Sequence, residues 1–247
     1  MATIAVLGTL DSKGEEHAFV AALIAQHGHK PLLIDVGTGG PATVQPDITR
    51  EQVAASIGLD LASLMAKKDR GACVVAMTHA APALVAKLAS DGRIHGIISL
   101  GGGGGTAIGT AAMRALPLGF PKLMVSTLAA GNVAPYLGTK DITMMPSIAD
   151  VAGLNRLSRV IFTRAAGAIC GMVSAEPSVG AAKPPHRRQP VRQHDYLRHG
   201  SQESPRSRRL RGPGLCRHRY GRTHHGVGHR ERHRLRRARC HHHRMGR

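Results

Sequence analysis

The sequence has 247 residues, of which 42% are hydrophobic and 20% are charged, and its formal net charge is +19. The charge is uneven, because residues 184–247 hold 19 Arg against 3 acidic residues, whereas residues 1–183 hold 15 Lys and Arg against 12 Asp and Glu. No apolar run reaches the roughly 18 residues of a membrane span, no secretory signal is present, and the 4 cysteines indicate no disulfide framework. We therefore expect a cytoplasmic protein without membrane contact, with a globular domain over residues 1–182 and a different segment over residues 183–247.

The globular domain alternates between strand and helix patterns. In chain order, these predict strand Thr3–Leu7, helix 14–26, strand Pro31–Val36, a helix from Arg50, helix 71–90, strand Ile94–Leu100, helix Thr106–Arg114, strand Lys122–Ser126, strand Asp141–Met145, helix Ser147–Ala166 and strand Ala168–Val173. Thr49 and Gln52 support the helix from Arg50, because they have the spacing of a capping box. Residues 71–90 also contain a strand-like run, but two elements there would leave no room for a turn, so one helix is expected.

The predicted strands are apolar throughout rather than alternating, which is typical of a parallel sheet covered on both faces. With helices between them, they indicate the α/β class: a Rossmann-like parallel sheet with helices on both faces. Ligands of such sheets bind beyond the carboxyl ends of the strands. Those ends carry small or polar residues here, namely Gly8-Thr9, residues 37–40, Gly101–Thr106 and Ser126-Thr127. One edge of the sheet is therefore expected to form a single site.

Five consecutive glycines are the strongest candidate for binding: Gly101, Gly102, Gly103, Gly104 and Gly105. Glycines permit positive φ and let backbone N–H groups approach a ligand closely. The helix expected from Thr106 would direct its free N–H groups and the positive end of its dipole at the same place, which suits phosphate or carboxylate. Neither a P-loop ending nor a dinucleotide fingerprint is present. The alternative is a tight turn without a ligand, but five glycines are entropically costly for a turn, so anion binding is preferred.

The segment after the first strand is a second candidate. Thr9, next to Gly8, can donate to a phosphate, Lys13 can neutralise it, and Asp11 can hold a metal ion or a ribose. Equally, Asp11 or Ser12 can cap the following helix without touching any ligand.

Four polar or small residues further along form a third candidate: Ser126, Thr127, Gly131 and Asn132. Hydroxyl and amide groups at a strand end can bind a nucleotide, and they also make ordinary turns. The sequence contains no Ser-His-Asp or Cys-His arrangement and no cluster of metal ligands, so it names no reaction.

Three long motifs carry a family resemblance: Gly8–Glu16, Ser99–Thr127 and Gly131–Asn155. In order and content they resemble the ATP-binding N-terminal domain of the tomato mosaic virus resistance protein and its bacterial relatives, across essentially all of residues 1–182. The family usually has a serine among the loop glycines, where this sequence has glycine throughout. The resemblance implies ATP as the cofactor, with or without Mg²⁺, a two-subdomain architecture, and a homodimer in intact relatives. It implies no reaction, so the function is either nucleotide binding or part of an ATP- or sugar-phosphate-dependent enzyme.

Residues 184–247 contain 11 of the 16 His residues and no Lys. Such a segment could bind nucleic acid non-specifically, and His241–His243 could bind a metal ion. A third explanation is translation out of frame, because GC-rich codons for Ala, Thr, Ile and Gly read as Arg, His, Pro and Gly when shifted by one base. Pro185–Gly200, for example, can be encoded so that a one-base shift reads LIAASLFGNTTTCVT. We therefore predict that residues 183–247 are an out-of-frame, disordered tail on a truncated family member.

Overall fold

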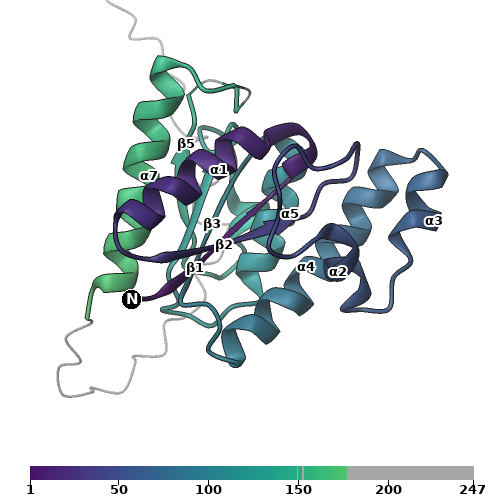
Figure 1. Ribbon diagram of the computed structural model, residues 1–247, viewed down its shortest axis with the longest axis horizontal. Helices are drawn as coiled ribbons and strands as arrows, with labels where there is room; N and C mark the ends of the chain where they lie inside the picture. The colour runs from purple at the N-terminus through teal and green to yellow at the C-terminus, as the bar shows by residue number, and fades with distance from the viewer. Residues whose placement is uncertain (149, 152, 177–247) are drawn as a thin grey trace, which may run out of the picture. The chain divides into compact units, whose positions relative to one another are not determined.

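The computed structural model describes residues 1–148, 150–151 and 153–176 (Figure 1). Its strands are β1 (Thr3–Gly8), β2 (Lys30–Asp35), β3 (Gly96–Gly101), β4 (Lys122–Ser126) and β5 (Thr143–Pro146). Its helices are α1 (Leu10–Gln26), α2 (Arg50–Ala55), α3 (Leu61–Ala66), α4 (Arg70–Ser90), α5 (Gly103–Arg114), α6 (Ala134–Leu137) and α7 (Arg156–Ser174). The strands form one sheet in the order β2-β1-β3-β4-β5, and each neighbouring pair is parallel. The predicted parallel α/β sheet is confirmed.

Helices cover both faces of this sheet, as predicted. Ala5 and Leu7 of β1 belong to the apolar core under α2, α4 and α5, whereas Ile4 and Val6 belong to the core under α1 and α7. Successive side chains of a strand point to opposite faces, so a strand buried on both sides must be apolar at every position. The uninterrupted apolar runs in the sequence have this cause.

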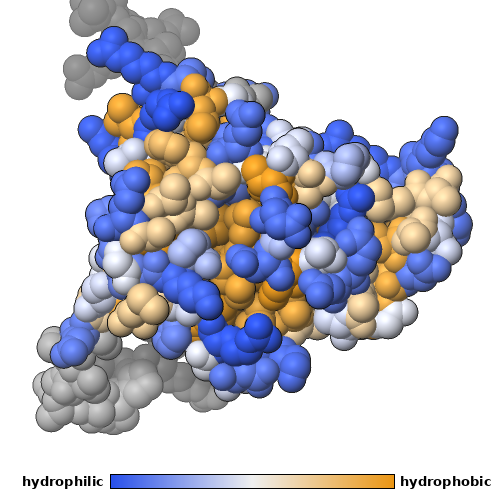
Figure 2. All heavy atoms as spheres, in the orientation of Figure 1, coloured by the Kyte–Doolittle hydropathy of each residue, from blue (hydrophilic) through white to orange (hydrophobic). Residues whose placement is uncertain are grey.

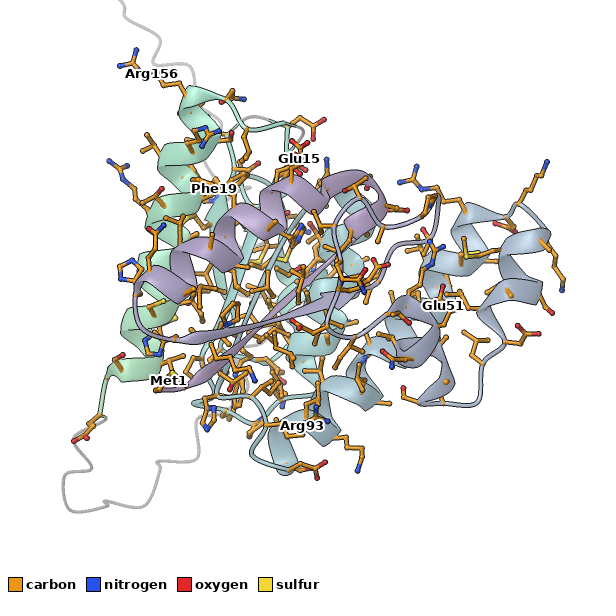
Figure 3. The ribbon with its side chains drawn as sticks, in the orientation of Figure 1. Met1, Glu15, Phe19, Glu51, Arg93 and Arg156 are labelled. Carbon is orange, nitrogen blue, oxygen red and sulfur yellow. The ribbon has the colours of Figure 1, made fainter. Side chains whose placement is uncertain are left out.

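Helices α1 and α7 pack side by side on one face. Phe19 of α1 lies beside α7 (Figure 3), where the guanidinium carbon of Arg159 is 5.1 Å from the centroid of its ring. In the space-filling view, hydrophobic residues gather over the middle of the molecule, around β2 at one edge of the sheet, and hydrophilic residues surround them (Figure 2).

The capping box and the single long helix are confirmed. Gln52 N donates to the Thr49 hydroxyl, and Thr49 N donates to Gln52 Oε1, which fixes the start of α2. Helix α4 runs without a break from Arg70 to Ser90, and the Asp69 carboxylate caps it by accepting from Ala72 N.

The predicted helix Ser147–Ala166 is confirmed over residues 156–166, but its start and the strand predicted after it were wrong. No helix begins at Ser147; α7 begins at Arg156, after the cap formed by Asn155 and Ser158. The run Ala168–Val173 is the last part of α7 rather than a strand. A short apolar run cannot be distinguished from a buried helical segment by its pattern. Here the buried residues before the run already have helical spacing, and the run continues that helix.

Smaller differences concern the start of α1 and the short helices α3 and α6, neither of which was predicted. Helix α1 begins at Leu10, four residues before the predicted start, and contains a non-helical residue at Lys13 (φ −139°, ψ 31°). The short helix α3 was not predicted because only one of its residues, Leu61, is buried, and one residue gives no helical periodicity.

Helices α4 and α7 have the length and apolar composition that a membrane span needs. Within their apolar windows, 33% of α4 and 39% of α7 is buried, the first against one core of the sheet and the second against the other. The predicted out-of-frame tail at residues 183–247 lies outside the described residues.

Candidate functional site

The strand order creates a crevice at the carboxyl edge of the sheet. β1 and β3 are neighbours, but β1 leads through α1 to β2 on one side, whereas β3 leads through α5 to β4 on the other. The loops that leave the two strand ends therefore diverge, and ligands of open α/β sheets bind at such a switch point.

A hollow of about 100 Å³ lies at this point. We call it the basic hollow, and its lining residues are Thr9, Ser12, Lys13, Thr38, Arg70, Val74 and Gly102–Gly105. It joins two segments that the sequence singled out, the start of α1 and the glycine run. The prediction that the strand ends form a common site is supported by this arrangement for β1 and β3, and Thr38 after β2 also reaches it.

The glycine run is not the loop that the sequence predicted. Helix α5 begins at Gly103, so three of the five glycines form its first turn, and Gly102 is its N-cap without a side chain to bond. None of Gly101–Gly105 uses the positive φ that glycine permits. The N–H groups of a first helical turn have no partner within the helix, and here they border the basic hollow.

The fold requires only part of the glycine run to be glycine. A Cβ on Gly101 would lie 2.9 Å from the Cα of Gly105, a backbone atom that cannot move cheaply. By contrast, a Cβ on Gly103 would meet no atom within 4 Å, and one on Gly104 would make an ordinary 3.7 Å contact with Val74 Cγ2. The missing side chain at Gly101 is explained by packing, whereas that at Gly103 leaves room beside the hollow.

The lining of the basic hollow contains two cations, Lys13 and Arg70, and no carboxylate. Lys13 is half-buried at the non-helical residue of α1, and Arg70 is exposed at the first position of α4. Three hydroxyls, of Thr9, Ser12 and Thr38, add donors, and the Ser12 hydroxyl lies 3.3 Å from Thr9 Oγ1. Sequence reasoning found Thr9 and Lys13 but missed Arg70, because only the packing of α4 against α5 brings it to this edge.

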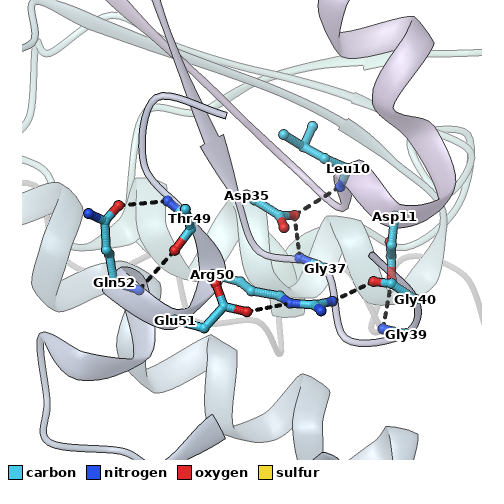
Figure 4. Close-up of polar contacts among 10 residues, drawn as sticks. All are labelled: Leu10, Asp11, Asp35, Gly37, Gly39, Gly40, Thr49, Arg50, Glu51 and Gln52. Atoms are coloured by element: carbon cyan, nitrogen blue, oxygen red, sulfur yellow. Dashed lines mark hydrogen bonds and ion pairs between the residues drawn. The ribbon is translucent and has the colours of Figure 1, made fainter. Parts of the chain in front are cut away.

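Two carboxylates near the hollow are engaged by the backbone (Figure 4). Asp35 Oδ1, at the end of β2, accepts from Leu10 N at 3.1 Å and from Gly37 N at 2.8 Å. Burial raises the pKa of Asp35, and the two amides offset this only partly. Asp11, a predicted site residue, accepts from Gly39 N at 2.6 Å through Oδ2, and it does not line the hollow. Both side chains position the loop after β2, and Asp35 was missed by sequence reasoning.

Gly8 gives room to a buried histidine. The ring of His17 would overlap a Cβ on Gly8, and its Nδ1 lies 2.6 Å from the carbonyl oxygen of Lys13. Burial lowers the pKa of His17, and its Nε2 has no partner among the described residues. A neutral ring that donates from Nδ1 therefore supports the segment of α1 that lines the hollow.

The third predicted group is divided by the structure. Ser126 and Thr106 are fully buried, and their hydroxyls bond to each other at 2.7 Å. Gly131 forms a turn through its N–H to Leu128 O, and Asn132 Oδ1 accepts from Ala134 N. In these contacts Ser126, Gly131 and Asn132 have structural roles within the protein, which was the alternative to nucleotide binding.

Thr127 is the member of this group that lines a hollow. This large hollow has a volume of about 570 Å³, and its lining residues are Thr127, Ala130, Pro146, Ser147, Ile148 and Asp150. A Cβ on Gly102 would lie 3.7 Å from Thr127 Oγ1, so Gly102 of the basic hollow and Thr127 of the large hollow are neighbours.

At the opposite end of the strands, a buried lysine pairs with an exposed aspartate. The Lys122 ammonium lies 2.8 Å from Asp141 Oδ1 and donates to the carbonyls of Pro117 and Phe120. Burial opposes ionisation of Asp141, but Lys122 and the Gly119 amide outweigh it and hold the pKa of that carboxyl below its ordinary value. Every donor of the ammonium is satisfied, which indicates a structural role. Over the described part of the chain, no three His, Cys, Asp or Glu side chains are grouped to hold a metal ion.

Comparison with known proteins identifies the family. The sequence model described as "Uncharacterised protein family (UPF0261) N-terminal domain" matches residues 2–178. The chain belongs to this family. A UPF0261 protein of Clostridium tetani is 47% identical over 182 residues, which are 73% of this chain and 45% of the relative. A UPF0261 protein of Rhizobium meliloti is 47% identical over 184 residues, which are 74% of this chain and 45% of the relative. The ToMV resistance protein Tm-1 of Solanum lycopersicum is 38% identical over 104 residues, 42% of this chain and 14% of that protein.

These matches confirm the resemblance predicted from the motifs. The chain spans about half the length of the curated UPF0261 relatives that it matches. Within the UPF0261 domain, the motifs Gly8–Glu16 and Ser99–Thr127 supply most of the basic hollow, and the third motif, Gly131–Asn155, supplies part of the large hollow.

Proposed function

We propose that this chain binds a nucleotide, ATP, with its phosphate groups in the basic hollow. The observation that carries the proposal is a hollow at the β1–β3 switch point with two cations, no carboxylate and the open first turn of a helix in its lining. Cations, hydroxyls and free N–H groups all favour an anion, and a helix N-terminus adds the positive end of its dipole.

The sizes of the two hollows support a phosphate in one and a nucleoside in the other. The basic hollow, at about 100 Å³, is the smaller of the two, and its cations and glycine N–H groups suit a phosphate. The large hollow, about 570 Å³, is in the size range of small-molecule sites. Thr127, next to Gly102, can donate to a ribose or phosphate oxygen.

The resemblance to an ATP-binding domain is the reason to name ATP first. Where Mg²⁺ accompanies the nucleotide, it is usually held by the substrate phosphates, water and one or two carboxylates. Because the chain spans 45% of the relatives' length, the second candidate is a fragment of an ATP- or sugar-phosphate-dependent enzyme. In that case the remaining catalytic groups belong to the other part.

The test must separate the hollow from the basic segment, because 19 Arg in residues 184–247 will attract any polyphosphate. Amide hydrogen exchange of the full chain, with and without ATP, reads the two regions separately. We expect ATP to slow exchange at Gly103–Gly105 and around Lys13. Protection confined to residues 184–247 would refute the proposal.

We also propose that residues 183–247 are translated out of frame. The support is the change of composition at this point and the end of the family match at residue 178. On this proposal the nucleotide function belongs to residues 1–182, and the basic segment has no role of its own.

A further inference from the structure

Lys13 and Arg70 come from separate elements and line one small hollow. Among the described residues the ion pairs are Arg50–Glu51, Lys87–Asp91 and Lys122–Asp141, so neither Lys13 nor Arg70 is neutralised by a carboxylate. Two like charges that share a hollow repel each other, and an anion between them converts this repulsion into attraction.

The packing of α4 fixes where Arg70 stands relative to the glycines. Asp69 caps the helix by accepting from Ala72 N at 2.9 Å, so Arg70 begins the helix at a defined place. Val74, one turn later and on the same face of α4, reaches the glycine run, because a Cβ on Gly104 would lie 3.7 Å from its Cγ2. Arg70 is thus held over the first turn of α5 by the α4–α5 contact.

We infer that Lys13 and Arg70 clamp the terminal phosphate of a polyphosphate chain, so that the site selects nucleoside triphosphates and diphosphates over monophosphates. The inference rests on the proposed nucleotide function. The nucleoside is assigned to the large hollow beside Thr127, and neither cation lines that hollow. Lys13 and Arg70 line the basic hollow alone, so on this assignment they meet the phosphates farther along the chain, which a monophosphate lacks. A longer chain reaches the guanidinium, which can bind phosphate oxygens in a bidentate, charge-assisted manner.

The experiment compares Arg70→Met and Lys67→Met in the full chain. Both substitutions remove one exposed cation near the start of α4, and both keep residues 184–247, so non-specific attraction is matched. Lys67 does not line the hollow. Affinities for ATP, ADP, AMP and tripolyphosphate are measured by calorimetry, with hydrogen exchange at Gly103–Gly105 as the site-specific signal. We expect Arg70→Met to weaken ATP and tripolyphosphate by about tenfold or more and AMP by less than about twofold. Lys67→Met should leave all four ligands within about twofold.

The outcomes separate the clamp from the nucleotide function. The clamp would be overturned if Arg70→Met lost equal affinity for ATP and AMP, or if Arg70→Met and Lys67→Met bound all ligands alike. In either case, slowed exchange at the glycines would still uphold nucleotide binding. Tripolyphosphate bound through Arg70 as tightly as ATP would uphold the clamp and refute a nucleotide site. If no ligand slows exchange at the glycines, both are wrong.

Discussion

The glycine run offers a pair of substitutions with opposite expectations for stability and binding. Gly103→Ala places a methyl group where no atom lies within 4 Å, at a residue that lines the basic hollow. Gly101→Ala places the same methyl group 2.9 Å from Gly105 Cα and 3.1 Å from Gly105 C. Gly101 ends β3 and Gly103 begins α5, and both changes add one carbon.

The magnitudes follow from these contacts. At Gly103 the backbone is already helical, so alanine should leave stability unchanged or raise it by up to about 1 kcal/mol. Its methyl group should weaken ATP by about tenfold, which corresponds to about 1.4 kcal/mol, because it enters the space assigned to a phosphate. At Gly101 the neighbours are backbone atoms in the first turn of α5, and overpacking of this kind typically costs about 1–3 kcal/mol.

Urea unfolding followed by far-ultraviolet circular dichroism measures stability, since the chain has no Trp. Hydrogen exchange at the start of α1 and of α5 measures ATP binding. If Gly103→Ala binds ATP as the wild type does, its glycine is not a phosphate cradle. If Gly101→Ala is as stable as the wild type, the steric reason given for the first glycine of the run is wrong.

Three further predictions concern buried groups and the coding sequence. His17 has a lowered pKa, so the unfolded chain gains a proton below about pH 6.5 that the fold resists; unfolding free energy should therefore fall by about 1.4 kcal/mol per pH unit below that value. This slope should be absent in His17→Gln when both proteins are unfolded in urea across pH 5–7. Asp35 has a raised pKa, so its contribution to stability is lost as the pH rises above about 3.8 through the folded value. At pH 7, Asp35→Asn, which keeps both acceptor bonds, should be at least as stable as the wild type. Asp35→Ala should cost about 1–3 kcal/mol for each orphaned amide, and equal melting of these two variants would contradict the role given to the carboxyl oxygen. Finally, DNA sequencing around codons 180–186 should reveal a one-base shift relative to close relatives, and a frame shared with those relatives would defeat the proposal.

Much of the fold could be predicted because its signals are local. The apolar runs at Thr3–Leu7 and Lys122–Ser126 are strands, and the Thr49–Gln52 capping box starts α2 where its spacing indicates. The failure at residues 147–173 has a physical reason as well. Asn155 caps α7 through an exchange with Ser158, and this pair lacks the Glu or Gln that marks the usual capping box.

The candidate site could be predicted where it follows strand ends and not where packing brings a residue from elsewhere. Thr9, Lys13 and the glycines lie directly after β1 and β3, so strand assignment was enough to expect them together. Along the sequence, Arg70 is far from any strand end, and it reaches the hollow because of how α4 packs against α5. Hydroxyls were misleading for a related reason, because residue type does not reveal that Thr106 and Ser126 bond to each other inside the core.

The placement of charge around the hollow is the feature that most favours an anion over an empty turn. Acidic residues are close in sequence, with Asp11 next to Thr9 and Asp35 at the end of β2, yet each is turned to a backbone amide of the loop after β2. A site for a cation would direct these carboxylates inward. Here the carboxylates hold the neighbouring loop, and the cations Lys13 and Arg70 remain for the hollow. This division requires no contribution from residues 184–247, so the full chain is expected to bind phosphate at the glycines whatever the origin of its basic segment.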